Sequence, residues 1–100
     1  MSIEQKEFVL SRQLLKSGTS IGANIREAQY AESRADFVHK IRIALKEANE
    51  TEYWLDLLSE SKFIDPETYI RQQNNIKLLL KILIRIVNST LKSNPLSVNR

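Results

Sequence analysis

Apolar positions in the middle of the chain repeat with the period of an α-helix. From residue 37 to 58 they follow one another in steps of four and three, the heptad spacing of a helix that packs along one face. The seam consists of Phe37, Ile41, Ala44, Ala48, Thr51, Leu55 and Leu58. Ser33 lies three residues before Asp36, which is the spacing of a helix cap. The pattern predicts a helix over about 34–61.

Apolar residues are denser towards the C-terminus. Nine of the twelve residues from 76 to 87 are aliphatic, and the exceptions Lys77, Lys81 and Arg85 recur every four residues. Only one narrow stripe of this helix therefore faces water. The sequence Asp65-Pro66-Glu67 is typical of a helix start, and Asn94-Pro95 of a helix end. These signals predict a helix over about 66–93 and a tail over 94–100.

A helix that is apolar almost all round needs cover from several sides. We therefore expect a second copy of the chain to pack on this last helix. The alternative is a bundle helix that leaves some apolar surface exposed, as many monomers do. The expected oligomer interface consists of Ile76, Leu79, Leu80, Leu83, Ile86 and Val87.

The stretch "KSGTSIGANIREAQYA", residues 16–31, has the composition of a turn or of a phosphate-binding loop. It has no preceding strand and no Gly-Lys-Ser/Thr ending, and no capping box follows its serines. Four-three spacing continues straight across it, through Leu10, Leu14, Ser17, Ile21, Asn24, Ala28 and Ala31. We therefore predict a helix over about 4–31, with the Gly/Ser cluster as a candidate kink. Gly18 and Gly22 share one face, where we expect another helix to approach closely.

Length and composition indicate one small domain without disulfides or thiolate metal sites. The 100 residues contain no cysteine, and 42% are apolar against 27% charged. No signal peptide is visible, and the most apolar run is too short and too charged to span a membrane. The cytoplasm is the expected location.

Charge is unevenly distributed. Residues 1–67 contain nine Lys/Arg and twelve Asp/Glu, whereas residues 68–100 contain six Lys/Arg and no acid. A short connection makes the last two helices antiparallel, so the end of one lies beside the start of the other. The expected nucleic-acid-binding residues at this end are Arg26, Arg34, Lys40, Arg42, Lys46, Lys81, Arg85 and Lys92. The alternative is a solvated helix face.

Polar residues within the helices are expected to fix their register. The predicted buried hydrogen-bond network comprises Asn24, Glu27, Glu47, Asn49 and Glu50. His39, the only histidine, has no Glu-x-x-His partner, so no metal site is expected. Tyr53 and Trp54 are expected in core seams, which leaves no aromatic platform for single-stranded bases. No catalytic spacing is present, so neither enzymatic activity nor a cofactor is expected.

Two blocks, "LLKSGTSIGANIREA" and "DFVHKIRIALKEANETEYWLDLL", resemble the four-helix-bundle family encoded in intervening sequences of bacterial 23S rRNA genes. The resemblance covers about residues 5–90. That family looks related to the accessory variability protein of diversity-generating retroelements, a pentameric barrel that binds nucleic acid and a reverse transcriptase. The resemblance implies a homopentamer whose partners are nucleic acid and a reverse transcriptase. Family members usually carry a further amphipathic helix before the segment "EFVLSRQLL", so three helices leave a groove that a neighbour or another segment must fill.

The sequence thus predicts an all-α antiparallel bundle of three long helices, four in the family, as one domain over residues 1–100 that assembles into a homo-oligomer. The function expected from charge and resemblance is a nucleic-acid-binding or ribonucleoprotein accessory factor. The alternative is a protein-interaction scaffold that does not bind nucleic acid.

Overall fold

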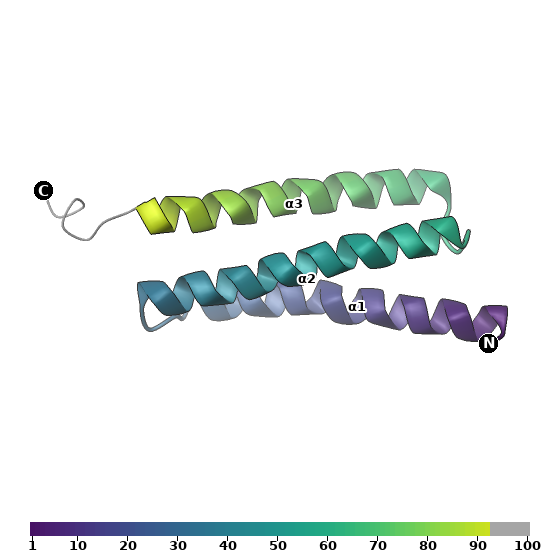
Figure 1. The fold of residues 1–100 in the computed structure, drawn as a ribbon, viewed down its shortest axis with the longest axis horizontal. Helices are drawn as coiled ribbons and strands as arrows, with labels where there is room; N and C mark the ends of the chain where they lie inside the picture. Colours follow the sequence, from purple (N-terminus) through teal and green to yellow (C-terminus); the bar gives the residue numbers. More distant parts are fainter. Residues whose placement is uncertain (93–100) are drawn as a thin grey trace, which may run out of the picture.

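The computed structural model describes residues 1–92 as three long helices (Figure 1). Helix α1 spans Ile3–Ala28, α2 spans Arg34–Glu60 and α3 spans Pro66–Lys92, and no strand occurs in this part of the chain. The all-α class is therefore confirmed, and every helix bound lies within three residues of its predicted position. The predicted tail over 94–100 lies outside the described residues.

Helices α2 and α3 begin at the predicted caps. The Ser33 hydroxyl accepts a hydrogen bond from the Asp36 backbone N–H at 3.0 Å. The Asp65 carboxylate accepts the Thr68 N–H at 3.1 Å and the Thr68 hydroxyl at 2.6 Å. Each cap provides an acceptor for an N–H that the first turn leaves without a helical partner. These bonds hold the pKa of the Asp65 carboxyl below its usual value.

A left-handed residue ends α2. Lys62 has φ of 62°. Its N–H donates to the Ser59 carbonyl at 3.0 Å, and the Phe63 N–H donates to the Leu58 carbonyl at 2.9 Å. These two bonds form a Schellman motif, which usually has glycine at the left-handed position. The motif turns the chain back towards α3.

Helix α1 continues through the Gly/Ser stretch, so the prediction of a helix rather than a phosphate loop is confirmed. The Ser17 hydroxyl donates to the Leu14 carbonyl at 3.2 Å, within the same helix. The close helix approach expected at Gly18 and Gly22 is wrong for the single chain. A Cβ atom built at either glycine meets nothing within 4 Å, because α2 packs against another face of α1.

Helix α2 lies between the other two and contacts both. Helices α1 and α3 each run antiparallel to α2 (Figure 1). Among residues 1–92, no Cα atom of α1 comes within 8 Å of a Cα atom of α3. An uncharged groove of about 390 Å³ opens on this side, lined by Ser11, Leu14, Leu15, Gly18, Thr19, Thr51, Leu55 and Gln72. The bundle is therefore open along one side.

Small residues of α2 bring the helices together. Ala44 and Ala48 are fully buried in the middle of the seam. Around them lies one core cluster to which all three helices contribute: Ile21, Ala28, Val38, Ile41, Ala44, Ala48, Leu55, Ile76, Leu83 and Val87. A buried hydrogen bond of 2.9 Å joins the hydroxyls of Thr51 and Ser17 across the α1–α2 contact.

Half of the residues expected to form an oligomer interface belong to the chain's own core. Ile76, Leu83 and Val87 are buried against α2, whereas Leu79, Leu80 and Ile86 are half-buried beside them. The expectation was wrong for the three buried residues, because an almost uniformly apolar helix does not indicate which side packs within the chain, and it stays a prediction for the three half-buried ones. The exposed apolar side chains of α3 are Ile70, Leu78, Ile82, Ile84 and Leu91.

Candidate nucleic-acid interface

Charge separates along the length of the three helices. One half contains the α1–α2 turn, the first half of α2 and the last half of α3. Residues 16–47 and 79–92 there include nine Lys/Arg and four Asp/Glu. The other half, residues 1–15 and 48–78, includes five Lys/Arg and eight Asp/Glu. We call the first half the basic end; it lies on the left in Figure 1.

Five of the expected nucleic-acid-binding residues are exposed cations on α2 and α3. These are Arg42, Lys46, Lys81, Arg85 and Lys92. Within residues 1–92, none of the five has an ion-pair partner within 4 Å. Lys81 and Arg85 follow one turn apart on α3, whose second half contains no acid, and Arg42 and Lys46 repeat this spacing on α2. The positive excess of the basic end therefore resides mainly on these two helices.

The other three expected residues, Arg26, Arg34 and Lys40, lie among acids near the α1–α2 turn. The Lys40 ammonium forms an ion pair with the Glu27 carboxylate at 3.0 Å. This hydrogen bond and the attraction of Glu27 raise the pKa of Lys40. A shallow cavity of about 410 Å³ at this turn is lined by Arg26, Glu27, Tyr30, Glu32, Asp36 and Lys40. Cations and acids therefore lie side by side at this turn. The acids offset the positive charge of the three cations, so the turn contributes less positive potential than the cations alone would.

The buried polar network expected between α1 and α2 does not form in the single chain. Glu27, Asn49 and Glu50 are exposed, and Asn24 and Glu47 are only half-buried. The Asn24 amide donates within α1, to the Ser20 carbonyl at 2.9 Å. The expectation was wrong because the seam positions that point into the core hold the small residues of α2, and these polar residues lie at its edge.

A polar cluster between α2 and α3 was missed by the sequence reasoning. The Asp56 carboxylate accepts the Tyr69 hydroxyl at 2.6 Å and the Gln73 amide at 2.5 Å. The bond to Asp56 raises the pKa of Tyr69. Gln73 is 9% exposed, and its Oε1 atom is buried without a hydrogen-bond partner. The available signal was the spacing of Tyr69 and Gln73, one turn apart on the inner face of α3.

Tyr53 and Trp54 do not lie in the core, so that expectation is also wrong. Tyr53 is 55% exposed and Trp54 is half-buried, and their rings meet edge to face with centroids 4.9 Å apart. Both residues precede the buried Leu55 of the α2 seam, and neither belongs to the core cluster or packs against it. Contrary to the expectation from sequence, aromatic side chains are therefore accessible to bases on this face of α2.

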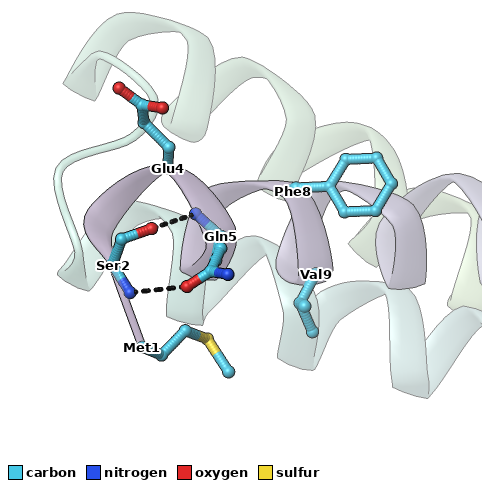
Figure 2. A pocket seen from close by; sticks show the side chains of 6 residues that line it. All are labelled: Met1, Ser2, Glu4, Gln5, Phe8 and Val9. Atoms are coloured by element: carbon cyan, nitrogen blue, oxygen red, sulfur yellow. Dashed lines mark hydrogen bonds between the residues drawn. The ribbon is translucent and has the colours of Figure 1, made fainter.

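The start of α1 forms an open pocket of about 800 Å³ (Figure 2). In it, the Ser2 hydroxyl accepts the Gln5 N–H at 3.1 Å, and the Gln5 side-chain oxygen accepts the Ser2 N–H at 2.9 Å. This reciprocal pair is a capping box. Because these bonds already satisfy its polar groups, and Met1 and Phe8 beside them are largely exposed, the pocket is a helix cap beside apolar surface.

Residues 1–92 contain neither a cluster of side chains that could hold a metal ion nor a helix that could cross a membrane. No group of three or more His, Cys, Asp or Glu side chains lies close enough to hold a metal ion. No helix in that range combines the length and apolar character needed to cross a membrane.

Known proteins with similar sequence and structure identify the family. Residues 2–85 match the family described as 23S rRNA-intervening sequence protein. No curated protein matches the chain. A crystal structure at 1.70 Å shows a protein of unknown function from the S23 ribosomal protein family of Bacteroides thetaiotaomicron that is 60% identical to this chain. The match covers 85% of this chain and 76% of that one, with a TM-score of 0.80. The chain therefore belongs to the 23S rRNA-intervening sequence protein family.

Proposed function

We propose that the protein is a non-enzymatic RNA-binding accessory factor that contacts phosphates through its basic end. The observation that supports this proposal is the group of five exposed cations without ion-pair partners: Arg42, Lys46, Lys81, Arg85 and Lys92. The family name, which refers to sequences within 23S rRNA, favours RNA as the polyanion.

The exposed cations determine how the affinity for RNA depends on salt and on sequence. Lys and Arg side chains that neutralise phosphates release condensed counterions, so affinity falls as salt rises. With five such contacts per chain, the logarithm of the association constant would fall with the logarithm of salt at a slope of about −3.5 to −4.5. Phosphate contacts carry no base information, so the basic end binds different sequences alike.

Titration of a fluorescently labelled RNA hairpin at several salt concentrations tests the proposal. The double variant Lys81→Gln/Arg85→Gln is expected to weaken binding to every hairpin sequence and to reduce the slope by about 1.5. The matched control Lys6→Gln/Arg12→Gln removes the same charge from the other half of the molecule, where both residues are exposed on α1. It is expected to leave the slope nearly unchanged.

Absence of hairpin binding at low salt, or equal losses in the two double variants, contradicts this proposal. The alternative function is then a scaffold that binds proteins, and the reverse transcriptase implied by the resemblance is one such partner. The exposed apolar side chains of α3, among them Leu78 and Ile82, favour this second candidate.

We also infer that further copies of the chain cover this apolar surface of α3. The homopentamer implied by the resemblance is the assembly we propose. A ring of chains with parallel helices would bring the basic ends together on one rim and add their phosphate contacts.

A further inference from the structure

A small polar pocket lies between α1 and α2, halfway along both helices. Its volume is about 250 Å³. Helix α1 contributes Gln13, Lys16 and Ser17, and helix α2 contributes Lys46, Glu47, Glu50 and Trp54. Ser17 is only 4% exposed, so its side chain lies deep in the pocket, whereas Lys16, Lys46 and Glu50 are exposed.

Opposite charges line this pocket without neutralising one another. Across residues 1–92, no ion pair within 4 Å joins Lys16 or Lys46 to Glu47 or Glu50. Glu47 and Glu50 lie three residues apart on α2, so their carboxyl groups are neighbours on the helix surface. The neighbouring Glu47 carboxyl raises the pKa of Glu50, while Lys46 and Lys16 act in the opposite sense. Both carboxyl groups line the pocket without an ion-pair partner, so they can accept hydrogen bonds from a ligand that donates them.

We propose that this pocket binds an unpaired guanine nucleotide of RNA. The base stacks on Trp54, its hydrogen-bond donors face Glu47 and Glu50, and its phosphate lies by Lys16 and Lys46. This inference rests on the proposed RNA-binding function and adds a base-specific contact to it.

The chemistry of the bases favours guanine. Its Watson–Crick edge presents two adjacent donors, the ring N1–H and the exocyclic amine, and a carboxylate only accepts. Uracil presents one ring donor between two carbonyl acceptors, which carboxylates repel. Unpaired bases in RNA are commonly held by aromatic stacking together with contacts to this edge.

The position of the pocket fits a strand that leaves the basic end. Lys46 lines the pocket and also belongs to the five exposed cations of the basic end. Arg42 precedes it by one turn of α2, on a neighbouring part of the helix surface. A strand whose phosphates follow Arg42 and Lys46 would therefore reach Trp54 with the next base.

Trp54 is the only tryptophan in the protein, so intrinsic fluorescence reports directly on the pocket. Wild-type protein is titrated with GMP and, separately, with UMP, using excitation at the red edge of the tryptophan band, where nucleotides absorb little. GMP is expected to quench saturably, with half-saturation at a concentration about tenfold lower than for UMP, because only guanine offers two adjacent donors to the carboxylates.

The variant Glu50→Gln tests the edge contact. We expect it to weaken GMP binding about tenfold and to leave the UMP response nearly unchanged. Glu60→Gln is the matched control, because Glu60 is an exposed carboxylate of the same helix that does not line the pocket. It is expected to leave both responses unchanged, and circular dichroism confirms that each variant is folded.

The inference is overturned if GMP does not quench, if GMP and UMP quench alike, or if Glu50→Gln and Glu60→Gln behave alike. The RNA-binding proposal is tested independently of the pocket inference. Lys81→Gln/Arg85→Gln should weaken hairpin binding but leave GMP quenching intact. Hairpin binding without GMP quenching removes the pocket inference alone. GMP quenching without hairpin binding overturns the assignment of the pocket to RNA.

Discussion

Replacing Leu78 and Ile82 together by aspartate is expected to prevent the assembly of chains that we propose, without unfolding the single chain. The two side chains are 59% and 45% exposed in the single chain, so about half of each remains to be covered. Full burial of a leucine or isoleucine side chain contributes about 1.5–3 kcal/mol, so covering the exposed halves contributes a similar sum for the pair. Losing this burial free energy weakens association about tenfold to a hundredfold. A carboxylate placed in an apolar contact weakens association further.

The same substitutions have little effect on the fold of one chain, because neither side chain lies in its core. Leu83→Asp is the contrasting variant. Leu83 is 1% exposed, and a buried unpaired charge there is expected to unfold the chain. Asn74→Asp/Asn88→Asp is the matched control, since it adds the same charge at exposed polar positions of α3.

Sedimentation velocity measures the mass of each variant, and circular dichroism measures its helix content. The double variant should sediment as a folded monomer, and the control should keep the wild-type mass. A wild-type protein that is already monomeric at micromolar concentration refutes the reasoning. So does a Leu78→Asp/Ile82→Asp protein with the wild-type mass.

Three further predictions concern the stability of the single chain, measured by thermal or urea unfolding. Gly18→Ala and Gly22→Ala should each stabilise it by about 0.5–1 kcal/mol, because the added methyl meets open space within a helix; a fall in stability would show that another chain packs there. Ser17→Ala and Thr51→Val should each destabilise it by about 1 kcal/mol, and the double variant by less than the sum; strict additivity would exclude a contribution from their shared hydrogen bond. Lys62→Gly should stabilise it by about 1 kcal/mol by relieving the left-handed conformation, and an unchanged midpoint would contradict this.

Local features of the fold could be predicted because their causes lie within a few residues. The caps at Ser33 and Asp65 each involve a side chain and an N–H three residues later. The continuity of α1 across Gly18 was visible in the unbroken four-three spacing. Both kinds of signal depend on sequence separation alone, so they hold whatever the neighbouring helices do.

Features that depend on the rotation of one helix against another could not be predicted. The apolar circumference of α3 gave no means of telling the buried Leu83 from the exposed Leu78. The ion pair of Lys40 with Glu27 joins residues thirteen positions apart, and only the packed α1–α2 contact brings them together. The sequence could therefore indicate an excess of cations at this end, but not that Lys40 forms an ion pair there.

The separation of the α1 and α3 backbones has a consequence for cooperativity. Because the backbone of each outer helix comes close to α2 alone, we expect each outer helix to detach while the other remains docked. Destabilising substitutions in α1 and α3 should then add independently, since sites that share no contact rarely couple. Any coupling between the outer helices passes through α2. Because both neighbours cover α2, its amide protons should be the last to exchange with solvent.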